Sequence, residues 1–501
     1  MPSWSQFVEA LQQDWWKILP QLQLILWGLG ILVTDFWLER RHKYWNAIVS
    51  MFGVGFSAWG LLRLYQVMRQ QGVESLTGFN GAVRVDSFFI FFGCLFLAAT
   101  ALVILISVRY LEIEAEHHGE YYALLLFAVV GMMFMACGYE LVTLFIGLET
   151  MALSFYVLTG FLRNDRRSNE GALKYLLLGA FSSGILAYGF SLLYGISGST
   201  NLDDIANAIA LRTPVESPTA SILVLLALVT VSVGLFFKIA AVPFHQWAPD
   251  VYEGAPTPIA AFVSVASKAA SFALLLRLFL VPFLPIRVNW ELLLGVVAVA
   301  TMTLGNFAAI TQTNVKRLLA YSSIAHVGYM LLGVVAGNAT GFKGVAFYLF
   351  AYTFMNTGAF AVIILLRRKG LIGDELEDLN GLIHRNPGAA VLMLIFLISL
   401  AGIPPTAGFV GKLLIFWGLI ETKHYVLAIF GALYIVPAVY YYFRIVVHMW
   451  MTDVTDAVRP TISPAQWAAL ATSVIIVLGA GLFPERFLKL AAYSLILPMG
   501  R

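Results

Sequence analysis

Long apolar stretches, separated by short polar segments, run through nearly the whole chain. A helix that crosses a bilayer needs about 20 mostly apolar residues, because each residue adds about 1.5 Å of length. By this measure the pattern predicts an all-α polytopic membrane protein of about fourteen transmembrane helices. The predicted spans are centred near Leu29, Gly55, Ala98, Val130, Leu153, Gly184, Val231, Ala269, Thr301, Gly328, Ala359, Ala401, Tyr434 and Val474.

Two apolar stretches are longer than one span, and proline interrupts each of them. The first runs from Ala220 to beyond Trp247 and contains Pro243, and the second carries Pro404 and Pro405 midway. Proline removes a backbone donor, and the freed backbone groups must find water or protein partners inside a membrane. Both stretches therefore predict discontinuous helices that line polar cavities, a pattern typical of transporters.

The recurrence of a broken helix predicts two inverted five-helix repeats, formed by spans four to eight and spans nine to thirteen. Because five is an odd number, the two copies must cross the membrane with opposite topology. We expect three N-terminal spans in 1–118, the first repeat in 119–285 and the second repeat in 286–450, followed by the last span and the C-terminus in 451–501. A lysine precedes the proline of the first break and follows those of the second, so the pattern gives no residue-level equivalence.

Basic residues gather in short loops at 39–43, 163–167, 315–317 and 367–369, which follow spans one, five, nine and eleven. If fourteen spans alternate in direction, all four loops fall on one side of the membrane. Short loops rich in Lys and Arg stay in the cytoplasm. We therefore expect these loops to be cytoplasmic and both termini to lie on the outer, periplasmic side.

The composition supports the membrane class and excludes others. The chain has 501 residues, of which 60% are hydrophobic and 12% are charged, whereas soluble domains carry about 25% charged residues. The net charge of +3 gives no reason to expect a nucleic-acid partner. Cys94 and Cys137 lie in apolar runs without a CxxC spacing, so no disulfide framework, metal site or iron–sulfur site is indicated.

Ionisable side chains within the predicted spans are the strongest functional signal. Lys268 lies near the middle of its span, where a lysine costs at least about 2.5–3.5 kcal/mol, and Glu149 is its acidic counterpart in span five. Lys238 lies beside the first proline break, and Lys412 lies beside the second. Taken alone, Glu149 or Lys268 could be a polar contact that only joins helices. Four such groups in one chain instead favour ion or proton transport.

Other polar residues in the spans give weaker signals. Arg277 lies late in its span and Lys174 near the start of its own, so either could reach the membrane interface, and we discount both as functional signals. His326 lies in span ten and could be either a packed hydrogen-bonding residue or a proton carrier. His245 follows Pro243 and could take part in the relay or lie at the interface. We take both histidines as relay candidates.

Five segments resemble the antiporter-like subunits of proton-pumping NADH:quinone oxidoreductase, respiratory complex I. They are "GLETMALSFYVLTGF", "ALKYLLLGAFSSGILAYGFSLLYGISGSTNL", "FFKIAAVPFHQWAPDVYEGAPTPIAAFVSVASKAA", "NVKRLLAYSSIAHVGYML" and "AGIPPTAGFVGKLLIF". The resemblance runs from about Tyr122 to Tyr442. The run in the sixth span and the lysine in the twelfth are most similar to the subunit N branch of this family. Mrp-type cation/proton antiporters and membrane-hydrogenase subunits share the same motifs, so a secondary antiporter remains the alternative function.

The resemblance implies roles for the candidate residues. Four of them match the family's buried glutamate and lysines, namely Glu149 in span five, Lys238 in span seven, Lys268 in span eight and Lys412 in span twelve. His326 lies where some paralogues have histidine. It implies a translocase subunit that moves protons through a Glu/Lys/His relay, driven by quinone reduction elsewhere in the complex.

The resemblance also implies where the rest of the chemistry lies. No cofactor is expected in this chain, because NADH, FMN, the iron–sulfur clusters and quinone belong to partner subunits. The implied partners are the other subunits of the complex, including sister antiporter-like subunits, together with membrane lipid. The implied location is the bacterial plasma (inner) membrane.

Overall fold

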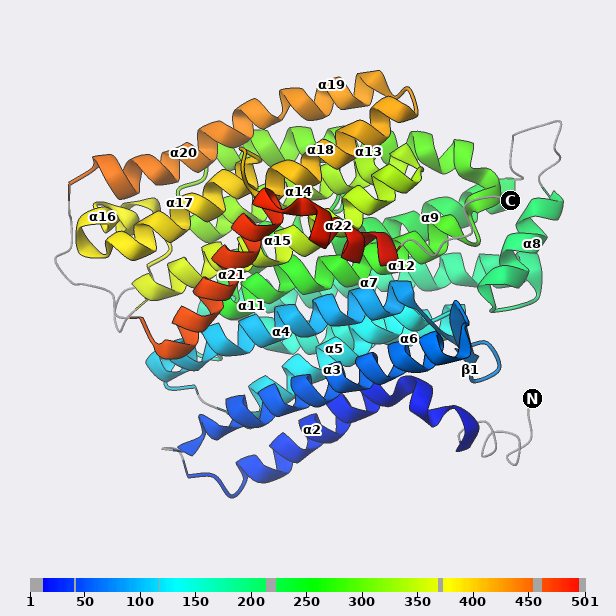
Figure 1. The fold of residues 1–501 in the computed structure, drawn as a ribbon, viewed down its shortest axis with the longest axis horizontal. Helices are drawn as coiled ribbons and strands as arrows, with labels where there is room; N and C mark the ends of the chain where they lie inside the picture. Colours follow the sequence, from blue (N-terminus) through cyan, green and yellow to red (C-terminus); the bar gives the residue numbers. More distant parts are fainter. Residues whose placement is uncertain are drawn as a thin grey trace.

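A computed structural model of the chain describes residues 12–39, 42–116, 118–212, 222–367, 373–453 and 462–494. These residues form a helical bundle with one short β-hairpin (Figure 1). The first half contains η1 (Trp15–Ile18), α2 (Leu19–Asp35), α3 (Trp45–Gln71), β1 (Ser75–Gly78), β2 (Val83–Asp86), α4 (Ser87–Glu114), α5 (Gly119–Cys137), α6 (Leu141–Thr159), α7 (Arg166–Ser197), α8 (Leu202–Arg212), α9 (Ile222–Ile239), α10 (Trp247–Gly254), α11 (Thr257–Phe262), η3 (Val263–Ser267) and α12 (Lys268–Leu280). The second half contains η4 (Leu284–Ile286), α13 (Arg287–Ile310), α14 (Val315–Ala336), α15 (Ala339–Leu366), η5 (Leu376–Leu379), α16 (Leu382–Arg385), α17 (Pro387–Ala401), α18 (Ala407–Glu421), α19 (Tyr425–Leu433), α20 (Ile435–Met451), α21 (Pro464–Leu482) and α22 (Pro484–Tyr493).

The described residues include 13 helical segments that are long and apolar enough to cross a membrane. Each of these segments contains the centre of one predicted span. The remaining centre, Ala401, is the last residue of α17, which is followed by α18 after a short break. The all-α polytopic class is confirmed, and the count of about fourteen holds if α17 and α18 are taken as one interrupted span.

Both predicted helix breaks are present. The helix α9 ends at Ile239, and α10 begins at Trp247 after an unwound segment that contains Pro243. In the second stretch, Gly402 ends α17 in the left-handed region at φ 84°, a conformation that glycine adopts without a steric cost. The inverted relation between the two five-helix sets, and the domain boundaries drawn from it, remain predictions.

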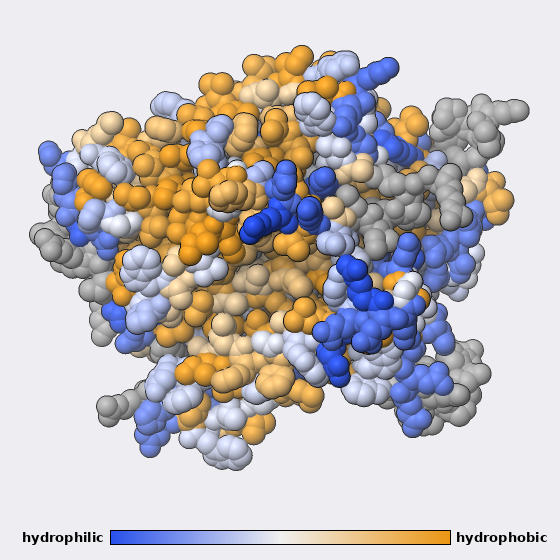
Figure 2. All heavy atoms as spheres, in the orientation of Figure 1, coloured by the Kyte–Doolittle hydropathy of each residue, from blue (hydrophilic) through white to orange (hydrophobic). Residues whose placement is uncertain are grey.

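The segment formed by α11, η3 and α12 occupies the centre of the bundle. Every residue from Thr257 to Leu280 is buried. Large apolar side chains are instead exposed on the peripheral helices, and Figure 2 shows apolar surface across the middle of the bundle, with hydrophilic residues gathered mainly toward its ends. The exposed apolar surface therefore belongs to the outer helices, whereas Lys268 is surrounded by protein.

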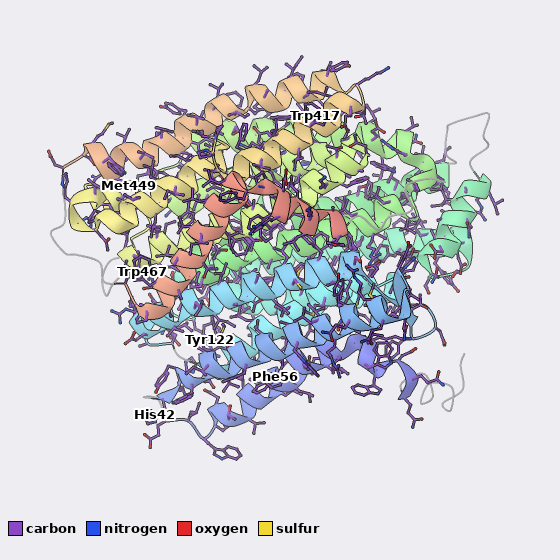
Figure 3. All side chains as sticks on the ribbon, viewed as in Figure 1. His42, Phe56, Tyr122, Trp417, Met449 and Trp467 are labelled. Atoms are coloured by element: carbon purple, nitrogen blue, oxygen red, sulfur yellow. The ribbon has the colours of Figure 1, made fainter. Side chains whose placement is uncertain are left out.

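The described parts of the four basic loops lie at one end of the bundle. Arg167 and Arg317 both pair with Glu253 at the end of α10, Arg317 also pairs with Asp250, and Arg367 pairs with Glu114 at the end of α4. His42, Met449 and Trp467 lie at this same end (Figure 3). This arrangement is consistent with the prediction that the four loops share one side of the membrane. Residues 40–41 and 368–369 of these loops lie outside the described residues, as do both termini.

The prediction for Arg277 is wrong. Its side chain does not reach an interface but is buried, and its guanidinium forms a bidentate ion pair with Asp86 at 2.7 and 2.8 Å. Asp86 also caps α4 by accepting a hydrogen bond from the Phe89 amide, and Arg277 donates to the carbonyl of Ala136 in the last turn of α5. One ion pair thus joins an end of α4, α5 and α12. Lys174, by contrast, is partly exposed and pairs with Glu170 and Asp250.

Replacing Arg277 by alanine is expected to destabilise the fold by about 3–5 kcal/mol, because it leaves Asp86 buried and unpaired. The measurement is the thermal stability of the assembled membrane complex. Lys174→Ala is the control, since a partly exposed pair contributes about 0–1 kcal/mol. The double variant Asp86→Leu/Arg277→Leu should be more stable than Arg277→Ala, and equal loss in both would show that the ion pair is not the cause.

Candidate functional site

Four of the six candidate residues lie deep in the interior. The exposed fractions of Lys238, Lys268, Lys412 and His326 are only 1–2%. Glu149 on α6 and His245 in the first break are half-buried. The four interior residues come from α9, α12, α18 and α14, which are far apart in the sequence.

Lys238 lies in the last turn of α9 and faces α6. Its Nζ donates a hydrogen bond to the hydroxyl of Tyr156 at 3.4 Å and lies 5.7 Å from the centre of the same ring. Glu149 interacts electrostatically with Lys238, but the two form no ion pair within 4 Å among the described residues. The Oε1 atom of Glu149 is buried and makes no hydrogen bond to any residue that the structure describes. The Glu149–Lys238 pair is therefore open in this structure, in the sense that no ion pair joins the two side chains.

Lys268 is the first residue of α12 and follows the π-helical turn η3. Single π turns inside α-helices occur often at functional sites. The Lys268 ammonium donates a hydrogen bond to the hydroxyl of Ser323 on α14. Ser323 also accepts a hydrogen bond from Tyr352 at 2.8 Å, and Tyr252 lies 3.4 Å away. No carboxylate contacts Lys268 among the described residues, so its partners are neutral hydroxyl groups.

His326 connects two tyrosines in the second half of the chain. Its Nδ1 lies 2.6 Å from the Tyr348 hydroxyl, and its Nε2 lies 3.0 Å from the Tyr442 hydroxyl. Tyr442 in turn is hydrogen-bonded to Ser322. Because Ser322 and Ser323 are neighbours on α14, the contacts of His326 and Lys268 meet on this helix. Hydroxyl and imidazole groups can both donate and accept, which suits a path for protons.

Lys412 lies across the second helix break from the end of α17. Its Nζ donates to the carbonyl of Ala401 at 2.8 Å and to that of Leu400 at 3.3 Å. The last carbonyls of a helix lack partners within the helix, and a cation there is favourable. Nζ also lies 4.7 Å from the ring centre of Tyr329, whose ring is 6.4 Å from that of His326. Lys412 thus adjoins the His326 cluster.

His245 does not join this network. It lies in the unwound segment between α9 and α10, and among the described residues its side chain makes no hydrogen bond to another candidate. The same segment is held to α13, because the Val242 amide donates to the Thr301 hydroxyl at 3.1 Å. The structure therefore gives His245 a place at the break but no connection to the lysines.

Sequence reasoning identified the charged residues and missed the tyrosines that contact them. Tyr156 could have been suspected, since it lies seven residues after Glu149 and therefore on the same face of one helix. Tyr348 and Tyr442 carry no such signal. They approach His326 from α15 and α20 only through the tertiary fold.

Comparison with known proteins gives consistent matches. Residues 138–436 match the family described as "NADH:quinone oxidoreductase/Mrp antiporter, TM". A protein of Solibacter usitatus (strain Ellin6076), named NADH-quinone oxidoreductase subunit N 2, is 56% identical over 486 residues, which are 96% of this chain and 97% of that protein. A chain of respiratory complex I from Thermus thermophilus with bound aureothin has a TM-score of 0.78 and 30% identity, covering 94% of this chain and 99% of that one. A chain of the Mrp complex from Dietzia sp. DQ12-45-1b has a TM-score of 0.81 at 20% identity, with 97% of each chain covered, and shows likeness of fold alone.

Proposed function

The chain belongs to the NADH:quinone oxidoreductase/Mrp antiporter family, as a proton-translocating, antiporter-like subunit of the subunit N type, and we propose that its buried lysines carry the protons. The proposed order is Lys238, Lys268, His326 and Lys412. Lysine suits this task because it can release its proton inside a protein, whereas arginine cannot.

The contacts of Lys268 carry this proposal. A buried ammonium with no carboxylate in contact is costly, and its charge can be removed by passing the proton to a neighbour. Its hydroxyl neighbours lead along α14 toward His326, and Tyr329 lies between His326 and Lys412. A role limited to joining helices would not require three buried lysines, two of which, Lys268 and Lys412, adjoin the polar groups around His326.

Glu149 supplies the proposed control of Lys238. At an effective dielectric constant of about 20, opposite charges 4 Å apart attract by about 4 kcal/mol. Since about 1.36 kcal/mol corresponds to a tenfold change in an equilibrium constant, closing the pair would strengthen proton binding by Lys238 about 10³-fold. Opening the pair would then release the proton toward Lys268. The open arrangement seen here, with the ammonium on Tyr156, is consistent with the second of these states.

The energy for this cycle is proposed to come from partner subunits. We place NADH, FMN, the iron–sulfur clusters and quinone in those partners and no redox centre in this chain. The translocase activity then belongs to the assembled complex, with sister antiporter-like subunits beside this one. The broken helices are proposed as the elements that respond to the partners.

The alternative function is that of an Mrp-type cation/proton antiporter or of a membrane-hydrogenase subunit, whose sequence motifs this chain resembles. The 56% identity to a subunit N protein favours the first proposal. The test is proton uptake into vesicles that contain the purified complex. We expect uptake that requires NADH and quinone and is independent of sodium. Uptake driven by a sodium gradient without NADH would instead establish the antiporter.

The location in the bacterial plasma membrane and the orientation of the chain are also proposals. A reporter inserted in the loop at 163–169 should be cytoplasmic, and a reporter fused after Arg501 should be periplasmic. The reason is the retention of short basic loops in the cytoplasm. Reporters that both give the same side would contradict the fourteen-span count, and reporters with exchanged sides would contradict the orientation alone.

A further inference from the structure

Tyr156 is the direct partner of Lys238 in this structure. The ammonium donates to its hydroxyl, and the ring of Tyr156 is buried with 6% of its surface exposed. Phe237 offers only a ring face, 5.8 Å away. No other side-chain hydrogen bond holds the Lys238 ammonium within the described part of the chain. The hydroxyl of Tyr156 is therefore the side-chain acceptor of the Lys238 ammonium in this structure.

The same face of α6 carries two alternative partners for this lysine. Glu149 and Tyr156 are seven residues apart, close to two helical turns, or about 10 Å along the helix axis at 1.5 Å per residue. Glu149 is the charged partner, and its Oε1 is buried without a hydrogen bond in the described residues. Lys238 rests on the other, neutral partner. Movement of the lysine along α6 would exchange one for the other.

The fold leaves space for the Tyr156 hydroxyl. A Cβ added to Gly179 on α7 would lie 2.0 Å from this hydroxyl oxygen and 2.7 Å from the ring carbon that bears it. Any larger residue at this position would push the tyrosine toward Lys238 or away from it. The glycine thus permits the position in which Tyr156 receives the ammonium.

A stack of aromatic rings joins Tyr156 to the broken helix. Its ring packs edge-on against Tyr175 at 4.8 Å, and Tyr175 lies flat against Trp247 at 4.4 Å with an angle of 6° between the rings. Trp247 begins α10, and its indole donates to the carbonyl of Phe237, the residue before Lys238, at 2.9 Å. A shift of α10 relative to α9 would therefore move both the lysine and the ring that holds it.

From these contacts we infer that Tyr156 is a positioning residue that holds Lys238 apart from Glu149 and links this open state to the first helix break through Tyr175 and Trp247. The inference rests on the proposed function, because it assigns Tyr156 a role through Lys238. Tyr156 stabilises the state from which the proton leaves, and Glu149 stabilises the state that holds it.

The test is NADH-driven proton uptake into vesicles, measured across a range of pH and normalised to assembled complex. Tyr156→Phe keeps the ring and removes the hydroxyl. We expect uptake to fall at least about fivefold, since a hydrogen bond to a charged group is lost, and the pH profile to move toward lower pH, because the ammonium loses an acceptor. Gly179→Ala should also reduce uptake. Tyr188→Phe is the control, because this tyrosine of α7 is exposed.

Combination with Lys238→Ala separates the possible results. If Tyr156 acts through Lys238, Tyr156→Phe adds no further loss in the Lys238→Ala background. A further loss in that background would overturn the inference in favour of a general structural role of Tyr156. The inference would also be overturned if Lys238→Ala is defective but Tyr156→Phe changes neither the proton uptake nor its pH profile. Wild-type uptake in Lys238→Ala would instead contradict the proposed function, because it would show that Lys238 does not carry protons. This outcome is distinct from failure of the inference about Tyr156.

Discussion

Lys238→Ala is expected to lower NADH-driven proton uptake at least about tenfold while the complex still assembles. The variant removes the first proposed proton carrier, and alanine cannot replace it. Assembly should survive because Lys238 has no ion pair within 4 Å among the described residues, so its removal leaves no buried carboxylate newly unpaired. The measurement is proton uptake into vesicles normalised to assembled complex. Lys174→Ala, which removes a partly exposed lysine from α7, should behave like the wild type.

Lys238→Arg distinguishes proton transfer from a purely electrostatic role. Arginine keeps the positive charge but does not release its proton in a protein. We therefore expect this variant to be nearly as defective as Lys238→Ala. Full uptake with arginine would mean that the charge alone is needed, and wild-type uptake with alanine would exclude Lys238 from the path.

The interior position of the lysines could be predicted from the sequence, because a charge in the middle of an apolar span has few acceptable places. The side chain must face protein or water, since lipid offers neither a partner nor solvation. The structure agrees for Lys238, Lys268 and Lys412, all of which are buried in the protein. The helix breaks could be predicted for a similar reason, since proline within an apolar stretch removes a backbone hydrogen bond wherever it lies.

The partners of these charges could not be read in the same way. Arg277 and Asp86 are separated by 191 residues, and only the packing of α12 against α4 and α5 brings them together. The sequence signal for Arg277 was its place late in an apolar span, which pointed to the interface and gave no sign of a buried partner. His326 shows the same limit, because its two tyrosine partners come from two other helices.

The electrostatic coupling of Glu149 and Lys238 leads to the second large effect. Glu149→Gln keeps the size of the side chain and removes its charge, so Lys238 loses the carboxylate that would stabilise its charged state. We expect proton uptake to fall at least about tenfold, because a lysine that binds its proton poorly cannot begin the cycle. Glu149→Asp keeps the charge on a side chain one methylene shorter and should be milder. Uptake is measured as for Lys238→Ala.

A double-mutant cycle tests whether the two residues act as one unit. If Glu149 works only by controlling Lys238, the variant Glu149→Gln/Lys238→Ala should be little worse than the more defective single variant. Losses that multiply would show independent roles, and the pair would have to be abandoned as the control element. This cycle is informative because Glu149 and Lys238 form no ion pair in this structure. Loss of a direct structural contact between them therefore cannot explain a coupled effect on proton uptake. A Glu149→Gln complex that fails to assemble would favour the role of a helix contact, because coupling in the transport cycle does not require Glu149 for folding.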